Sequence, residues 1–335
     1  NEGVDIIIDP TEISTIGFIE SFKNIRSHFK NLKLLSEYID REQPDVIFLV
    51  DFSGFNMLMA RIANKKDIPV VNYFPPSAWI WGKWRAKWMA RYNATIAAVF
   101  PMEREVYSEV GAKVHFVGHP LLDIIRIRDR KKEIYSRLEL RPDQKVIGLL
   151  PGSRTGEINA LLPEMLQAAE KINNQEEENY QFVLPLAAGV NKAKVAEKVG
   201  EFNLIVKIVE DYTYETIYIS DLILVASGTA ALEAAILETP MIIMYKTSWS
   251  SYQLGKRLIQ LEQIGMPNII ANNEIVPELL QEDVNGDKIY QESVNLLHKP
   301  YLLKGIKKKL ARVREMLGER GATTRTAELI LREGA

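Results

Sequence analysis

Residues 221–240 read DLILVASGTAALEAAILETP and contain the pattern that decides the fold. The apolar run at 222–226 is too short for a globular helix and is typical of a buried strand. A small turn, Ser-Gly-Thr at 227–229, comes next, and the Ala- and Leu-rich residues after it are strong helix formers. The stretch therefore predicts a strand, a tight turn and a helix in immediate succession.

The turn at 227–229 has the properties of an anion-binding site. The first N–H groups of a helix lack internal partners and lie at the positive end of the helix dipole. Gly228 carries no Cβ that would hold a ligand away from the backbone, and Ser227 and Thr229 add hydroxyl groups. A phosphate fits such a turn, and Glu233, one helical turn further on, is in reach of sugar hydroxyls on the same ligand. The alternative is an ordinary turn in which Thr229 is the helix N-cap.

A second turn of the same kind follows the predicted strand at 146–150. It reads Pro-Gly-Ser-Arg at 151–154 and precedes a predicted helix that starts at Glu157. Gly152 and Ser153 are small, and Arg154 supplies a positive charge with a planar fork of donors. Two phosphate-type loops after strands that can adjoin in one sheet indicate a phosphate-bearing ligand more strongly than either loop alone.

Strands and helices alternate along the whole chain, as in α/β proteins with parallel sheets. Besides the strands already named, we expect strands at 4–8, 45–51, 69–74, 94–100, 113–117, 182–186, 204–209 and 241–245. We expect further helices at 12–40 and 252–263, and two basic helices in the tail at 301–332. The length of 335 residues predicts two domains, divided within the charge-rich stretch 126–144. The expected domains are 1–140 and 141–300, and the helices of 301–335 pack back on the first domain or exchange between the protomers of a homodimer.

The composition excludes several classes of function. The net charge of −2 does not indicate nucleic acid as a partner. The chain has no cysteine and therefore no disulfide and no cysteine nucleophile, which fits a cytoplasmic protein. Its four histidines are dispersed, and we expect neither a metal site nor another cofactor. No apolar run reaches the roughly 18 residues of a transmembrane helix. No signal peptide is visible, and because the chain starts at Asn1 we expect that N-terminal sequence is missing.

Three polar residues stand where ligands are usually bound in parallel sheets, or close to such places. Asp51 ends the predicted strand at 45–51, and a carboxylate at the carboxyl end of a strand can act as a general base or simply cap a helix. His119 follows the predicted strand at 113–117 and contacts a ligand or caps the turn. Asn268 follows Met-Pro, and its side chain either forms a hydrogen bond with a ligand or caps a turn.

Two stretches have the composition of a membrane-contacting surface. The predicted helix at 12–40 is apolar on more than one face near its start, and residues 79–91 read WIWGKWRAKWMAR. Aromatic rings suit the headgroup region of a bilayer, and cations suit anionic lipid. The alternatives are a helix buried between neighbours, and tryptophans that form core below a rim of solvated cations. The candidate residues for such a surface are Ile16, Phe18, Ile19, Phe22, Trp79, Trp81, Lys83, Trp84 and Arg85.

Six stretches together resemble the lipid-A-disaccharide synthase family of glycosyltransferase-B enzymes, from about residue 11 to the end. They occur in family order and at family-like spacing. They are LVDFSGFN at 49–56, PPSAWIW with the cations after it at 75–91, FVGHPLLD at 116–123, LLPGSRTGEI at 149–158, ASGTAALE at 226–233 and MPNIIAN at 266–272.

The resemblance implies two Rossmann-like domains with parallel sheets that face a cleft. It implies a UDP-linked 2,3-diacylglucosamine donor and a 2,3-diacylglucosamine 1-phosphate acceptor, joined with inversion into a β-1,6 disaccharide as UDP leaves, without a required metal. It also implies a protein bound peripherally to the inner face of the cytoplasmic membrane. The implied catalytic carboxylate is Asp51, and the implied contacts to the UDP-sugar are Gly152, Ser153, Arg154, Ser227, Gly228, Thr229, Glu233 and Asn268.

The chain departs from the family pattern in two places. The family's first strand and its Gly-rich Ser-Gly-Asp loop are absent, and the chain has Phe-Ser-Gly-Phe at 52–55 where the family usually has Pro-Asp in the middle positions. Two rival functions follow. One is a glycosyltransferase-B enzyme that transfers N-acetylglucosamine from UDP to a non-lipid acceptor, and the other is a non-catalytic protein that binds UDP or a membrane.

Overall fold

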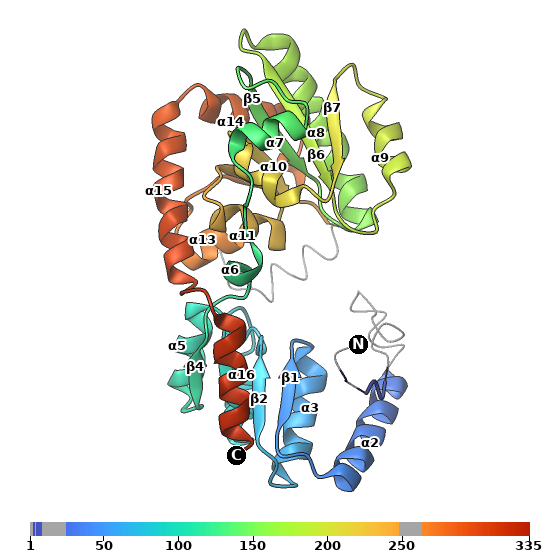
Figure 1. Ribbon diagram of the computed structural model, residues 1–335, viewed down its shortest axis with the longest axis vertical. Coiled ribbons are helices and arrows are strands. Elements are labelled where there is room, and N and C mark those ends of the chain that lie inside the picture. Colours follow the sequence, from blue (N-terminus) through green and yellow to red (C-terminus); the bar gives the residue numbers. More distant parts are fainter. Residues whose placement is uncertain (1–2, 4, 9–24, 248–262) are drawn as a thin grey trace. The chain divides into compact units, whose positions relative to one another are not determined.

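The computed structural model describes residues 3, 5–8, 25–247 and 263–335 (Figure 1). The chain forms two compact units, an N-terminal unit of Asn1–Val117 with Thr323–Ala335 and a C-terminal unit of Gly118–Ala322. The division therefore falls before the charge-rich stretch 126–144, in which we expected it. The reason is that Ile134 and Leu138, in and just after α7 (Lys131–Arg137), are buried against strands of the C-terminal unit.

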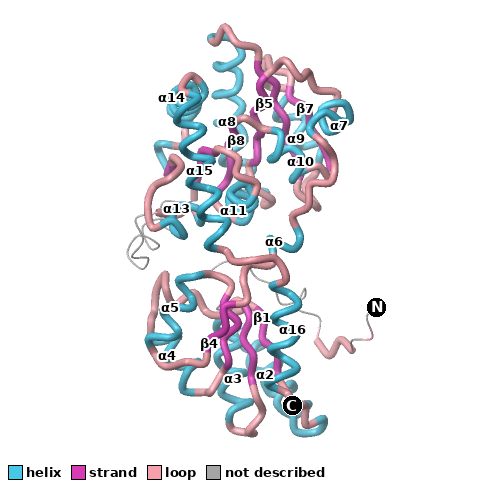
Figure 2. The backbone as a smooth tube through the Cα atoms, turned by 60° about the vertical axis from the view of Figure 1, so that its left-hand side comes forward, coloured by secondary structure: helices cyan, strands magenta, loops and turns pink. Residues whose placement is uncertain are grey.

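The N-terminal unit contains a parallel sheet of four strands in the order β1-β2-β3-β4 (Figure 2). The strands are β1 (Ile47–Val50), β2 (Val70–Tyr73), β3 (Thr95–Ala98) and β4 (Val114–Phe116). Each crossover carries a helix, which is how parallel neighbours must be connected. The helices of this unit are α2 (Ile25–Glu42), α3 (Ser53–Asn64), α4 (Trp84–Arg91), α5 (Pro101–Glu109) and α16 (Ala322–Glu333).

The C-terminal unit contains a parallel sheet of six strands in the order β10-β9-β8-β5-β6-β7. The strands are β5 (Lys145–Leu150), β6 (Tyr180–Leu186), β7 (Val206–Glu210), β8 (Leu222–Ala226), β9 (Met241–Tyr245) and β10 (Glu278–Leu280). All five residues of β8 are buried, as an unbroken apolar run requires when helices cover both faces of a sheet. The remaining elements are α6 (Leu121–Ile124), α8 (Thr155–Gln175), α9 (Lys192–Val199), α10 (Thr213–Ile219), α11 (Thr229–Ile236), α13 (Met266–Ala271), the 3-10 helix η2 (Gln281–Asp283), α14 (Gly286–Leu297) and α15 (Pro300–Met316).

The expected neighbourhood of the two phosphate-type loops is confirmed, because β5 pairs directly with β8 in the register Ile147↔Leu222 to Leu150↔Val225. After β5 the chain adds β6 and β7 on one side, and then crosses back to add β8, β9 and β10 on the other. The order of strands therefore reverses between β5 and β8. In sheets of this kind ligands bind beyond the carboxyl ends of the strands at such a reversal.

Some expected elements differ from the structure or lie outside it. The strand expected at 4–8 is wrong for residues 5–8, which form a bend with Ile6 80% exposed and no ladder partner in the described part of the chain. The helix expected at 12–40 is confirmed from Ile25 onward, whereas 12–24 lie outside the described residues, as does the helix expected at 252–263 apart from its last residue, which is not helical.

The two tail helices belong to different units. α15 packs on α11 and α13 in the C-terminal unit. α16 packs on the N-terminal sheet, where Leu329 is buried against Val71 and Val117. Glu333 accepts hydrogen bonds from Thr95 Oγ1 at 2.9 Å and from Lys113 Nζ at 2.6 Å. The last helix therefore packs back on the first unit, which is one of the two arrangements expected for the tail.

Candidate functional site

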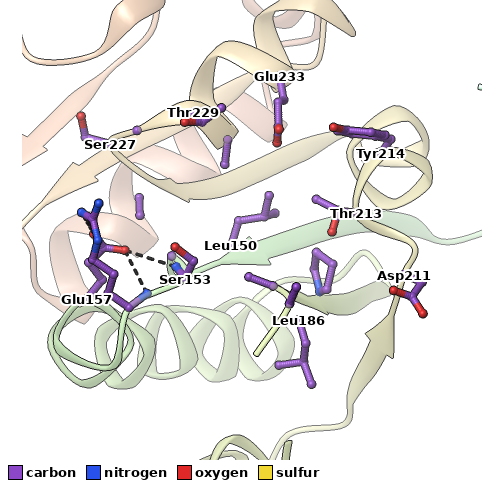
Figure 3. A pocket seen from close by; sticks show the side chains of 18 of the residues that line it. Leu150, Ser153, Glu157, Leu186, Asp211, Thr213, Tyr214, Ser227, Thr229 and Glu233 are labelled. Atoms are coloured by element: carbon purple, nitrogen blue, oxygen red, sulfur yellow. Dashed lines mark hydrogen bonds and ion pairs between the residues drawn. The ribbon is translucent and has the colours of Figure 1, made fainter. Parts of the chain in front are cut away.

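A cavity of about 630 Å³ lies at the carboxyl edge of the C-terminal sheet, where the strand order reverses. Its volume is in the range of sites for small molecules and cofactors. Residues that follow β5, β6, β7 and β8 converge on it. They include Gly152, Ser153, Arg154 and Glu157 after β5, Ala187 and Ala188 after β6, Asp211, Thr213 and Tyr214 after β7, and Ser227, Gly228, Thr229, Ala230 and Glu233 after β8 (Figure 3).

The N-terminus of α11 presents open backbone donors to this cavity. The N-cap is Gly228, not Thr229 as in the simple alternative, and no side chain caps the helix. The N–H groups of Thr229 and Ala230 have no hydrogen-bond acceptor among the described residues, and both residues line the cavity. A Cβ at Gly228 would meet no protein atom within 4 Å. This end of α11 therefore has the free donors, the positive dipole and the open space that an anion needs.

The N-terminus of α8, by contrast, already has an internal anion. Glu157 Oε2 accepts the backbone N–H of Ser153 at 3.2 Å and that of Arg154 at 3.4 Å (Figure 3). Gly152 has φ +108°, and a Cβ there would collide with the Glu157 side chain. The Glu157 carboxylate therefore occupies the backbone cradle expected at 151–154. The N–H group of Ser153 is already bonded and is not open to a ligand, which corrects the contact expected there. What this loop can offer a ligand is the Arg154 guanidinium, whose side chain is 64% exposed.

Glu157 was missed by sequence reasoning as a member of the site, although a signal for it exists. It stands at the third position of α8, where a Glu accepts the N–H groups at the start of a helix in a capping box. Its carboxylate also accepts a hydrogen bond of 3.0 Å from Arg154 Nη1 through Oε1. A Glu three residues after the helix N-cap, which is Arg154 here, therefore points to a side chain that shapes the loop.

The wall formed by α10 and α11 carries a second polar pair. Tyr214 and Glu233 both line the cavity, and the Tyr214 hydroxyl points toward the Glu233 carboxylate (Figure 3). Burial raises the pKa of the Glu233 carboxyl above its ordinary value, and the nearby Tyr214 hydroxyl opposes that shift. Tyr214 was also missed, because an aromatic residue in the first turn of a short helix gives no separate signal.

Asn268 is a correction to the expected ligand contacts. Its side chain is completely buried and does not line the cavity. The amide nitrogen donates to Val276 O at 2.8 Å and to Glu278 Oε1 at 2.7 Å. The amide oxygen accepts the backbone N–H groups of Ile275 at 2.8 Å and Val276 at 3.0 Å. Because both ends of the amide are used inside the fold, Asn268 holds the chain after α13 in place.

His119 takes the second of its two expected roles. Its Nδ1 accepts the backbone N–H of Leu121 at 3.2 Å, so the ring caps the turn that leads into α6. The side chain is buried, and burial lowers the pKa of the imidazole to about 4. It is not among the residues that line the cavity.

Asp51 stands at the carboxyl edge of the N-terminal sheet, directly after β1, and is exposed. Asp51 and Phe52 both adopt left-handed backbone conformations, with φ 49° and φ 46°. Such angles are uncommon for residues other than glycine, and strained turns of this kind cluster at functional sites. The turn is held by the Asp51 N–H, which donates to Tyr73 O at 3.0 Å, and by the Asn56 amide, which donates to the Asp51 carbonyl. The fold therefore fixes where the carboxylate emerges.

The proposed membrane-facing residues differ in their exposure. Trp81 is 42% exposed, Trp84 is 50% exposed, and Lys83 is also exposed, whereas Trp79 is half-buried. Arg85 is a correction, because it is buried and its Nη2 donates to Ser77 O at 3.0 Å and Trp81 O at 2.8 Å. Burial lowers the pKa of this guanidinium. Ile16, Phe18, Ile19 and Phe22 lie outside the described residues.

Neither a metal site nor a membrane span emerges from the described residues. Within them, no group of three or more His, Asp or Glu side chains is arranged to hold a metal ion. No helix in the described part of the chain is long and apolar enough to cross a bilayer.

The sequence matches a family model along most of its length. The model of the lipid-A-disaccharide synthetase family matches residues 1–331. The chain is 36% identical to the lipid-A-disaccharide synthase of Geobacter sulfurreducens over 329 residues, which cover 98% of this chain and 85% of that protein. It is 35% identical over 335 residues to the protein of the same name from Persephonella marina, covering 98% of this chain and 88% of that protein.

Solved structures share the fold at low sequence identity. The UDP-GlcNAc 2-epimerase from Neisseria meningitidis, solved bound to UDP-GlcNAc, superposes with a TM-score of 0.60 at 15% identity and covers 97% of this chain and 84% of that chain. MurG of Acinetobacter baumannii superposes with a TM-score of 0.53 at 13% identity and covers 93% of this chain and 79% of that chain. At these identities the likeness shows the fold alone.

Proposed function

Because the chain belongs to the lipid-A-disaccharide synthase family, we propose that it joins UDP-2,3-diacylglucosamine to 2,3-diacylglucosamine 1-phosphate and releases UDP. The chain is a glycosyltransferase of lipid A biosynthesis with a glycosyltransferase-B type fold. The proposal concerns the acylated substrates, the residues that act on them and the membrane that supplies them.

One observation carries the choice of the donor site. The cavity at the β5–β8 reversal combines the uncapped N-terminus of α11 with the exposed guanidinium of Arg154. Open helix donors and a planar cation are what a diphosphate needs, and in a metal-free reaction they must also stabilise the charge that develops on the leaving UDP. In our proposal the diphosphate binds at Gly228–Ala230, and Glu233 accepts hydrogen bonds from the ribose hydroxyls.

The transfer itself is a single displacement with inversion. The 6-hydroxyl oxygen of the acceptor attacks the anomeric carbon of the donor, and the bond from that carbon to the β-phosphate oxygen breaks. UDP leaves with the electron pair of that bond, and the Asp51 carboxylate takes the hydroxyl proton. The exposure of Asp51 at the end of β1 and the strained turn that holds it support this role.

Acylated substrates imply contact with a lipid surface. Trp81, Lys83 and Trp84 are exposed together at the start of α4, and aromatic rings with cations suit the headgroup layer of a bilayer. We therefore infer that the chain binds peripherally to the cytoplasmic membrane, on the face where UDP-sugars are present.

The test is a transfer assay with donor and acceptor presented in mixed micelles. We expect the disaccharide and UDP to form in equal amounts, and we expect no product when UDP-N-acetylglucosamine replaces the acylated donor. Equal turnover of the two donors would favour the rival transferase with a non-lipid acceptor. UDP binding without transfer from either donor would favour the non-catalytic alternative.

A further inference from the structure

The N-terminal unit has a cavity of its own, of about 470 Å³, where the C-terminal ends of α3 and α4 meet. α3 follows β1 and leads to β2, so its C-terminus lies at the edge of the sheet where the strands begin. Asp51 stands at the opposite edge, where β1 ends. The cavity is therefore separate from the proposed site of transfer. Its lining residues are Arg61, Asn64, Lys65, Trp88, Arg91 and Tyr92.

The cavity is strongly positive. Arg61, Lys65 and Arg91 are exposed, and none of them forms a salt bridge with any residue that the structure describes. Their neighbour Lys66, by contrast, pairs with Asp40. Cations in the last turn of a helix interact favourably with the helix dipole, which accounts for each of the three singly. It does not account for their convergence from two helices on one cavity, where unpaired positive charges repel one another unless an anion is bound.

Aromatic side chains connect this cavity to the rest of the exposed surface of α4. Trp84 and Trp88 pack edge to face with ring centroids 5.6 Å apart, and Trp88 and Tyr92 do the same at 6.1 Å. Trp84 is 50% exposed and Trp88 is 37% exposed, although both are large apolar side chains. Exposed tryptophan next to unpaired cations is the combination that suits the boundary between lipid headgroups and water.

We propose that the cavity lined by Arg61, Lys65 and Arg91 binds the phosphate of an anionic phospholipid headgroup, while the Trp84–Trp88–Tyr92 ladder lies in the headgroup layer. The phosphate accepts hydrogen bonds from the two guanidinium groups and the ammonium group, which replace its hydration. The proposal rests on the membrane contact proposed above but not on glycosyl transfer. It adds selectivity for anionic lipid to that contact.

The test measures binding of the full chain, without substrates, to sedimentable vesicles of phosphatidylcholine alone and of phosphatidylcholine with phosphatidylglycerol, at physiological salt. The test variant is R61Q/K65Q/R91Q. The matched control is K307Q/K308Q/K309Q, which removes the same charge from exposed positions of α15 in the C-terminal unit. Thermal unfolding of both variants shows whether the fold is kept.

We expect phosphatidylglycerol to strengthen binding of the wild-type chain and of the control variant. We expect the test variant to lose this increment, with a fall in the partition coefficient on the order of 100-fold, since each cation near an anionic surface contributes about a fivefold factor. Loss of the increment in both variants alike would show general charge attraction and overturn the proposal. So would an unchanged increment in the test variant, or release of the wild-type chain from the vesicles by millimolar inorganic phosphate, which would identify a site for free phosphate.

The vesicle experiment distinguishes failure of the proposed membrane contact from failure of the proposed pocket for anionic lipid. If the chain binds vesicles of both compositions equally, the membrane contact stands and the anionic pocket is refuted. If it binds neither, the membrane contact itself is refuted, and the transfer assay in micelles decides the catalytic function independently.

Discussion

Arg154 donates a hydrogen bond of 3.0 Å from its guanidinium to Oε1 of Glu157, the same side chain that accepts the backbone N–H groups at the start of α8. The cation beside the proposed diphosphate site is therefore held by an acid from its own helix. An isolated pair of this kind at the surface contributes little to stability. The pair instead fixes the orientation of the Arg154 guanidinium, and with it the direction in which the remaining N–H groups point.

Arg154→Ala should weaken UDP binding by about 1.5–3 kcal/mol, the scale of a charge-assisted hydrogen bond to phosphate. Glu157→Ala should weaken it less, through the lost orientation of Arg154 and of the loop. Titration calorimetry of both single variants and the double variant gives the coupling, which we expect to reach about 0.5 kcal/mol or more. Strictly additive losses would show that Glu157 does not act through Arg154.

Gly228→Ala should lower UDP affinity at least about tenfold with little change in thermal stability. The added Cβ meets no protein atom within 4 Å, so the fold tolerates it, but it intrudes where the phosphate approaches the α11 donors. Gly305→Ala is the matched control, because its Cβ also meets nothing and Gly305 does not line the cavity. Undiminished UDP affinity in the Gly228 variant would move the diphosphate away from this turn.

Asp51→Asn should leave UDP affinity unchanged and lower turnover by roughly 10²–10⁴, the contribution of a positioned general base. The amide has nearly the same shape, and Asn also tolerates the left-handed conformation found at this position. Single-turnover kinetics with saturating donor separates the chemical step from binding. Turnover at the wild-type rate would refute the base role.

Tyr214→Phe tests the pair on the other wall of the cavity. The change removes the hydroxyl that faces the Glu233 carboxylate, and we expect a loss of about 1 kcal/mol in UDP affinity, the scale of one hydrogen bond. The loss should shrink for 2′-deoxy-UDP if Glu233 binds the ribose hydroxyls through that position. An equal loss for both nucleotides would mean that Tyr214 contacts the ligand elsewhere or acts only on the fold.

Glu103 in the N-terminal unit provides a test by pH. Its carboxylate is buried and accepts the N–H groups of Val99 at 2.8 Å and Phe100 at 3.1 Å, and burial raises the pKa of the carboxyl from 4.5 to about 7. Between these two values the folded state binds more protons than the unfolded state, so stability falls as the pH rises through this window. Glu103→Gln cannot ionise and should escape the fall.

The stability of the Glu103→Gln variant relative to the wild-type chain should therefore improve by roughly 2–3 kcal/mol between pH 4.5 and pH 7.5. Urea unfolding at the two pH values measures it. A constant difference between variant and wild-type chain across this range would show that Glu103 titrates normally.

The sequence by itself determined the elements whose signals are local. The strand at 222–226 has the expected bounds and the helix follows it after the expected turn, because a short apolar run, a small turn and a run of helix formers are all contained in neighbouring residues. For the same reason the charge and backbone chemistry of Arg154 and Gly228 could be recognised before the fold was known.

Only the tertiary structure decided which of these features meet. The pairing of β5 with β8 brings two loops from distant parts of the chain to one cavity, and no local pattern specifies a pairing across more than seventy residues. Burial decided the corrections. Asn268 and Arg85 are polar and suited to a ligand or a lipid surface, but both are enclosed by the fold, where Asn268 Nδ2 and Arg85 Nη2 donate to backbone carbonyls. A polar side chain has the same chemistry in a site or in a core, and its surroundings settle which role it takes, because a buried polar group must be paired inside the protein.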